Sequence, residues 1–142
     1  MKRHLLLAAT IGIVALSGWG GPASAQLGGA GRKVGYFLSD NAYSPKATLK
    51  VRKGETITFT FVNKGKVVHE ALVATRAAQA SHEKEMGTMG AMAMTDEADL
   101  VSLKPGQTKS ISFKFDKAGR YEIGCHQSTH YQLGMKVPIV VT

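Results

Sequence analysis

Hydrophobic and polar residues alternate with a period of two in several short runs of the chain. In the segment 55–62, Ile57, Phe59 and Phe61 alternate with threonines, and the segment 109–116 alternates in the same way. Because successive side chains of a strand point to opposite faces of a sheet, each run predicts a half-buried strand. Further strands are predicted over residues 34–38, 48–51, 67–74, 120–125 and 136–141.

Short segments rich in glycine, asparagine and proline separate these runs, as expected for tight turns. Several short strands at this spacing predict an all-β fold, an antiparallel sandwich or barrel. Pro138 lies inside the last run and has no backbone N–H to donate. We therefore expect that strand to run at the edge of its sheet or to contain a bulge.

The segment from about 75 to 98 departs from this pattern. It is rich in alanine, glutamate and methionine, and predicts a helix or long loop inserted between strands. Its methionines either pack against the sheets as adaptable filler or form a soft thioether patch for Cu(I). The residues of this candidate accessory patch are Met86, Met89, Met92, Met94 and His82.

The only cysteine of the chain stands in a metal-ligand pattern close to the C-terminus. Cys125, His130 and Met135 follow the spacing C-x4-H-x4-M. Two imidazoles and a thiolate in one plane, with a weak axial methionine, hold copper in blue electron-transfer centres. His69 is the natural candidate for the missing imidazole because it lies in an apolar, strand-like run. The pattern therefore predicts a mononuclear copper site.

Several short motifs along the chain accompany the ligand pattern: Gly54-Glu55, Pro105-Gly106, Tyr121-Glu122-Ile123-Gly124-Cys125, Cys125-His126 and the His-Tyr-x-x-Gly-Met tail. With these motifs the chain resembles the cupredoxins, the blue type 1 copper proteins, over the whole of its mature part. It is most similar to exported, single-domain members of the plastocyanin, azurin and rusticyanin type. The resemblance implies a Greek-key β-sandwich that holds one copper ion, cycling between Cu(I) and Cu(II), on His69, Cys125, His130 and Met135.

Other interpretations of these residues remain open. Zinc also accepts one cysteine and two histidines, although it would leave Met135 unused. Cys125 and Met135 alone are equally explained as core residues, but the two histidines are not.

Two neighbours of the ligands are weighed as supporting residues. Adjacent strand residues point to opposite faces, so we expect His126 to face solvent or a partner; the alternatives are another ligand or an electron-exit edge. Glu70 stands where many blue-copper proteins have asparagine or serine. It either bonds the amides of the ligand loop, places negative charge near copper, or faces solvent.

Residues 1–25 have the three parts of a secretory signal peptide: a basic start, an apolar core and a small-residue cleavage site. The apolar core is shorter than a spanning helix needs, so we expect cleavage, export to a periplasm and no stable membrane insertion. A flexible glycine-rich lead-in is expected over 26–33, followed by one domain over 34–142.

A lone cysteine cannot form an internal disulfide, and metal ligation explains why an exported chain keeps it.

The formal charge of the chain is +8, and loss of Lys2 and Arg3 with the signal leaves +6. The basic residues are dispersed, which argues against nucleic acid and leaves docking to an acidic redox partner as a weaker reading.

We expect a monomer that transfers single electrons to a partner such as a cytochrome or oxidase. The rival function is copper resistance or metallochaperone activity, with the same site and the methionine patch passing copper to a copper-handling protein. An enzyme is not expected, because no residue is apparent that would orient a Cys–His nucleophile pair.

Overall fold

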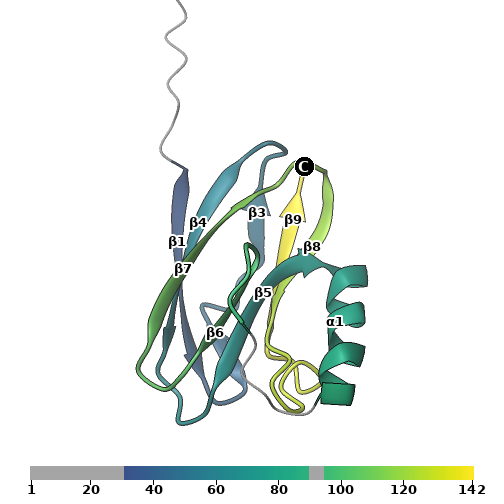
Figure 1. The fold of residues 1–142 in the computed structure, drawn as a ribbon. Coiled ribbons are helices and arrows are strands. Elements are labelled where there is room, and N and C mark those ends of the chain that lie inside the picture. The colour runs from purple at the N-terminus through teal and green to yellow at the C-terminus, as the bar shows by residue number, and fades with distance from the viewer. Residues whose placement is uncertain (1–30, 90–94) are drawn as a thin grey trace, which may run out of the picture.

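Two β-sheets pack face to face around a single core in the computed structural model, which describes residues 31–89 and 95–142 (Figure 1). The four-stranded sheet contains β1 (Arg32–Ser39), β2 (Ala42–Ser44), β4 (Thr56–Asn63) and β7 (Thr108–Lys114), in the order β2-β1-β4-β7. The five-stranded sheet contains β3 (Leu49–Val51), β5 (His69–Thr75), β6 (Leu100–Leu103), β8 (Gly119–Gly124) and β9 (Lys136–Val141), in the order β3-β9-β8-β5-β6.

The alternation in β4 separates the core from the surface as the sequence predicts. Ile57, Phe59 and Phe61 are fully buried. On the opposite face, the hydroxyl group of Thr58 lies 2.9 Å from that of Ser112 in β7, and Thr60 pairs with Ser110 at the same distance. The hydroxyl pairs thus link β4 to β7 on the outer face, while the stacked rings of Phe59 and Phe61 pack in the core beneath β4.

The prediction of a β-sandwich is confirmed, with two corrections. The sheets are mixed instead of purely antiparallel, because β1 pairs parallel with β4 and β3 pairs parallel with β9. They are also not closed into a barrel. The strand β9 lies between β3 and β8, but its pairing with β3 begins only at Ile139. At Pro138 the strand is therefore paired on the β8 side alone, which agrees with the edge expected at this residue.

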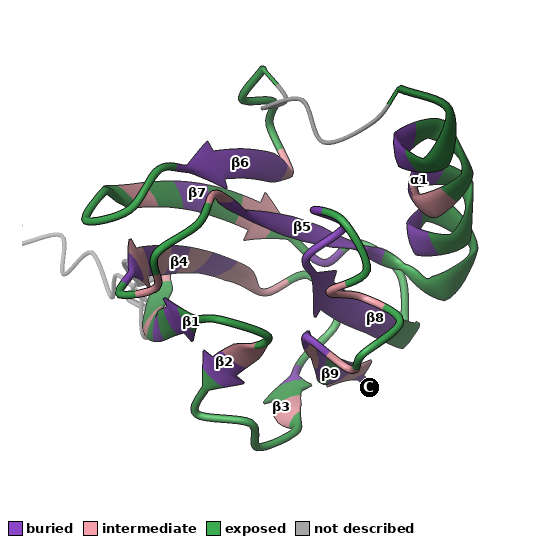
Figure 2. Ribbon diagram, turned by 90° about the horizontal axis from the view of Figure 1, so that it is seen from below, coloured by how far each residue is buried: buried purple, intermediate pink, exposed green. Residues whose placement is uncertain are grey.

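The inserted segment forms one helix, α1 (Arg76–Met89), directly after β5. Its buried residues are Gln79, His82 and Met86, which share one face by their spacing of three and four. This face packs against β5 and β8, and Figures 1 and 2 show the helix standing beside the five-stranded sheet. The helix therefore covers a sheet face that would otherwise meet solvent.

Several expectations fall outside the described residues: the signal peptide (1–25), most of the lead-in (26–33), and Met92 and Met94. The strand β1 begins at Arg32, so the last two residues of the expected lead-in are already strand. Among the described residues, no helix combines the length and the apolar character that a membrane crossing requires.

Candidate metal centre

Three strands bring the predicted ligands to the same end of the five-stranded sheet. His69 is the first residue of β5, Cys125 follows the last residue of β8, and Met135 precedes the first residue of β9. Because β8 runs antiparallel to both neighbours, the end of β8 lies beside the starts of β5 and β9. Their register therefore explains why residues more than 50 positions apart meet.

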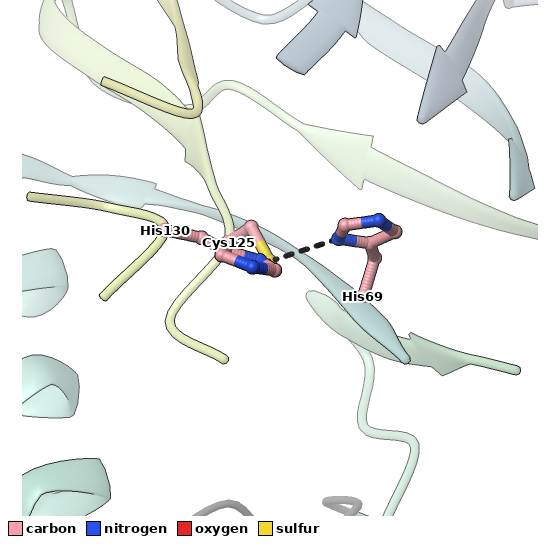
Figure 3. A group of neighbouring side chains, drawn as sticks. All are labelled: His69, Cys125 and His130. Atoms are coloured by element: carbon pink, nitrogen blue, oxygen red, sulfur yellow. Dashed lines mark hydrogen bonds between the residues drawn. The ribbon is translucent and has the colours of Figure 1, made fainter. Parts of the chain in front are cut away.

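His69, Cys125 and His130 form a compact cluster (Figure 3). The sulfur of Cys125 lies 3.7 Å from Nδ1 of His69 and 3.5 Å from Nδ1 of His130. Metal–sulfur and metal–nitrogen bonds of about 2.3 and 2.0 Å, at an angle of roughly 110–120°, place sulfur and nitrogen about 3.5–3.7 Å apart. The donor atoms thus have the separation that one shared ion requires.

One ring nitrogen of His69, Nε2, has no hydrogen-bond partner in the described part of the chain. The side chain is fully buried, and its Nε2 lies 3.6 Å from the Asp40 carboxylate, beyond ordinary hydrogen-bond length. The other ring nitrogen, Nδ1, points at the Cys125 sulfur at 3.7 Å, so the ring presents this nitrogen to the cluster. The close approach of Gly65 fixes the ring, because a Cβ there would lie 2.8 Å from His69 Nε2.

Met135, the fourth predicted ligand, is the residue directly before β9. It is fully buried in the main core together with Cys125. Two backbone bonds close the ligand loop around it: Cys125 N–H donates to Met135 O at 3.2 Å, and Met135 N–H donates to His130 O at 2.9 Å. His130 is half-buried, whereas the other three predicted ligands are fully buried.

Burial changes the acidity of all three clustered groups. It raises the pKa of the Cys125 thiol to about 12, although backbone N–H groups of Glu70 and Gln127 that point at the sulfur oppose this shift. Burial also lowers the pKa of both imidazoles, and for His69 the neighbouring His130 lowers it further. Neutral imidazoles are the form that binds metal.

Of the alternatives weighed for Glu70, exposure to solvent is wrong, because the residue is fully buried. Its carboxylate accepts a 2.5 Å hydrogen bond from Gln127 Nε2 and lies 3.4 Å from His82 Nε2 on α1. Its backbone N–H points at the Cys125 sulfur at 3.3 Å, and its carbonyl accepts from the Tyr43 hydroxyl. Glu70 thus joins the ligand strand, the ligand loop and the helix.

His126 points away from Cys125, as alternation predicts, but it does not face solvent. Only 1% of it is exposed, because α1 covers it. Its two ring nitrogens contact the carboxylate of Glu83 and the side-chain oxygen of Gln79. Burial lowers the pKa of His126, and the Glu83 carboxylate opposes that shift.

Three residues of the candidate accessory patch, Met86, Met89 and His82, lie among the described residues, and all three are on α1. Met86 is buried on the inner face of α1, whereas Met89 is 43% exposed on the same helix. His82 contacts Glu70. The sequence analysis did not identify Gln79 and Glu83 as neighbours of the site. For Gln79 a signal exists, because it shares the spacing of three and four residues with His82 and Met86 on one face of the helix. For Glu83 the sequence carries no such signal.

Comparisons with known proteins agree with this geometry. The profile of the copper-binding plastocyanin/azurin family matches residues 38–142. The "Copper-resistant cuproprotein CopI" of Rubrivivax gelatinosus is 35% identical over 112 residues, which are 79% of this chain and 67% of that protein. The protein of the same name from Pseudomonas aeruginosa is 30% identical over 139 residues, covering 78% and 76%.

Solved structures show the same fold. Dithionite-reduced auracyanin of Roseiflexus castenholzii superposes with a TM-score of 0.66 at 26% identity, over 80% of this chain and 99% of that one. An azurin of Methylomonas sp. strain J gives a TM-score of 0.63 at 19% identity, over 80% and 99%. The profile match, which includes the His–Cys–His cluster, shows that the chain belongs to the plastocyanin/azurin family of copper-binding proteins.

Proposed function

We propose that this chain is an exported, monomeric cuproprotein that holds one copper ion on His69, Cys125, His130 and Met135 and carries single electrons through it. The observation that carries the proposal is the convergence of two imidazole nitrogens on one buried thiol sulfur at 3.5 and 3.7 Å. When bound, copper supplies reversible one-electron exchange between Cu(II) and Cu(I). The chain supplies a donor set of nitrogen and sulfur that suits both states.

The ligands are held by groups that belong to the rigid fold. His69 and Cys125 adjoin paired strands, and Met135 is bonded through its backbone to both Cys125 and His130. The raised pKa of the Cys125 thiol keeps it protonated near neutral pH without metal, which is the opposite of what a catalytic thiolate needs. The site is therefore suited to holding a metal ion and not to nucleophilic catalysis.

Half-buried His130 is the route by which an electron would leave. It lines a surface hollow with Val67, Val68, Gln127 and Ser128, and Leu133 nearby in the ligand loop is 64% exposed. We infer that a redox partner, such as a cytochrome or oxidase, docks over this end of the sheet.

Copper resistance is the second candidate function, and the printed names of the CopI relatives favour it. In this case the same site would bind copper and release it to a copper-handling protein. The two functions differ in one measurable property. An electron carrier retains its ion through repeated reduction and oxidation, whereas a copper carrier releases Cu(I) to an acceptor.

The experiment combines voltammetry with copper transfer. The mature protein, loaded with one equivalent of copper, is cycled between its two redox states beside a Cu(I) chelator held behind a dialysis membrane. A reversible one-electron wave with copper retained over many cycles supports the electron carrier. Loss of copper to the chelator on the first reduction contradicts it and supports copper delivery.

Copper binding should release one proton per ion near neutral pH. The thiol of Cys125, with its pKa raised to about 12, must lose its proton, whereas both imidazoles, with lowered pKa values, are already neutral. Because binding competes with protonation of one thiol, the apparent dissociation constant should fall about tenfold per pH unit as the pH rises. Calorimetry in two buffers of different ionisation enthalpy counts the proton. Release of no proton would mean that the free thiol is already ionised.

Replacing Glu70 by glutamine should raise the reduction potential. The change removes a fully buried negative charge whose backbone N–H points at the sulfur ligand, so Cu(II) loses stabilisation relative to Cu(I). Coulomb's law therefore predicts a positive shift of the potential, which becomes smaller as the effective dielectric constant rises. Voltammetry measures the shift, and Glu85→Gln, at a solvent-exposed carboxylate of α1, is the control. An unchanged potential would contradict the electrostatic role of Glu70, whose hydrogen bonds would then only connect the ligand loop to the helix.

A further inference from the structure

The excess positive charge of the protein gathers at the end of the sandwich that lies away from the metal centre. Figure 1 shows the start of β1, the turn between β3 and β4 and the end of β9 at one end, and the ligand loop at the other. The strand ends and turns of this basic end carry only two acidic residues, Glu55 and Asp116. Its eight basic residues are Arg32, Lys33, Lys50, Arg52, Lys53, Lys114, Lys117 and Arg120. The rest of the described chain contains eight basic and eight acidic residues, so basic residues that are dispersed in the sequence are brought together by the fold.

A hollow of about 760 Å³ lies in the basic end. Its lining residues are Arg32, Lys50, Val51, Arg52, Lys53, Glu55 and Thr142. The Glu55 carboxylate is already used by the wall of the hollow, because it accepts from the backbone N–H of Arg52 at 2.9 Å and from Nε of Arg32 at 2.8 Å. Both bonds lower the pKa of Glu55, so this carboxylate stays charged and paired. Arg32 also donates to Lys50 O at 2.7 Å. Arg32 and Glu55 therefore shape the hollow and neutralise one another.

Three further cations of the hollow have no such partner. The side chains of Lys50, Arg52 and Lys53 are exposed and form no hydrogen bond or ion pair with any residue that the structure describes. Lys114, at the same end, is paired with Asp116 at 2.9 Å. Even with a main-chain carboxylate counted at Thr142, positive charge exceeds negative charge in the hollow. The mutual repulsion of these three cations is relieved only when an anion enters.

The strand register shows that the positive charge extends beyond the hollow. Lys50 in β3 is aligned with Val140 in β9, and Val140 is aligned with Arg120 in β8. The neighbours of Val140 in β9 are buried, so Val140 and the two aligned residues face outward. Two strand spacings separate Lys50 from Arg120, which is about 10 Å. One small anion cannot contact cations at this spacing, whereas an extended segment with several carboxylates can.

We propose that the basic end is a docking surface for an acidic segment of a partner protein, with carboxylates of that segment in the hollow beside Lys50, Arg52 and Lys53. A protein segment suits the surface better than a membrane does. The exposed large apolar side chains of the described chain are Phe37, Val67, Met89 and Leu133, and none belongs to the basic end. Nothing apolar is therefore available there for insertion into lipid. A protruding segment can also enter a hollow that a flat surface would only cover.

A partner held at the basic end leaves the metal centre accessible. Arg120 and Cys125 are five residues apart along the extended strand β8 and its end, which corresponds to about 17 Å. A segment docked over the hollow therefore does not cover His130. The inference goes beyond the proposed function and does not depend on it. The basic end would hold the protein beside one partner while the ligand loop faces a second one.

The experiment measures the fluorescence anisotropy of a dye-labelled hexaglutamate peptide during titration with the mature protein at low ionic strength. We expect saturable binding that weakens as salt is added. The double variant Arg52→Gln, Lys53→Gln should weaken binding about tenfold, because it removes two of the three unpaired cations. Neither side chain bonds another described residue, so the fold should persist.

The matched control is the double variant Lys66→Gln, Lys104→Gln. It removes the same total charge from exposed positions before β5 and after β6, at the metal end, and should bind the peptide as the unchanged protein does. An equal loss in both double variants would overturn the proposal, because binding would then follow net charge alone. Binding to vesicles that contain an anionic phospholipid, without binding to the peptide, would also overturn it and assign the surface to a membrane. Displacement of the peptide by an equal concentration of inorganic phosphate would contradict an extended partner and leave a site for a small anion.

Discussion

Replacing Cys125 by serine should abolish the intense visible absorption of the copper-loaded protein. That absorption is a charge transfer from a thiolate to Cu(II), and Cys125 is the only cysteine of the chain. Serine is similar in size and its oxygen can accept the Glu70 N–H that now points at the sulfur at 3.3 Å, so the fold should persist. Without the thiolate, copper affinity should also fall, by about 100-fold or more.

The measurement is a visible spectrum during titration with Cu(II), in which the unchanged mature protein should saturate at one equivalent. Met135→Leu is the control, because it keeps the thiolate and both imidazoles and should retain the absorption. An absorption that persists in Cys125→Ser would remove Cys125 from the site. Copper bound only as Cu(I), and dependent on the segment from Met86 to Met94, would contradict the electron carrier and favour copper handling.

Local patterns in the sequence account for the strands that carry a clear alternation. The strand β4 is predictable because its inward residues are large and apolar and its outward residues are threonines. The strand β6 is not, because all four of its residues are buried and no alternation remains. The strand β2 has only three residues, too few for a pattern. The parallel pairings of β1 with β4 and of β3 with β9 depend on how the chain crosses between the sheets.

The candidate site divides in the same way. The His–Cys–His cluster could be predicted, since ligand chemistry restricts which residue types can meet there. The burial of Glu70 and His126 could not, because alternation gives the face of a residue but not what covers that face. Here the helix α1 (Arg76–Met89), which is distant from Cys125 in the sequence, covers that face. The burial of a polar residue next to a ligand therefore depends on the inserted segment that packs on its strand, and not only on the alternation within that strand.

Gly124→Ala tests whether the packing of α1 against β8 stabilises the fold and the copper site. We expect this change to destabilise the protein and to disturb the copper site. A Cβ at Gly124 would lie 2.5 Å from Gln79 Oε1 and 3.0 Å from the ring of Tyr131. Gln79 cannot yield easily, because it bonds Leu72 and Glu122 through its nitrogen and His126 through its oxygen. Overpacking costs about 1–3 kcal/mol, and each lost buried hydrogen bond about 1 kcal/mol more.

The free energy of unfolding of Gly124→Ala, measured by denaturant titration, should therefore fall by about 3 kcal/mol. The matched control is Gly87→Ala on the exposed side of α1, where no atom lies within 4 Å of the added Cβ. That change should stabilise the helix by about 0.5–1 kcal/mol, because alanine is the better helix former. Because Gly124 precedes Cys125, displacement of the helix should also shift the visible absorption of the copper-loaded protein. A Gly124→Ala protein with unchanged stability and spectrum would show that α1 packs on the ligand strand without constraining it.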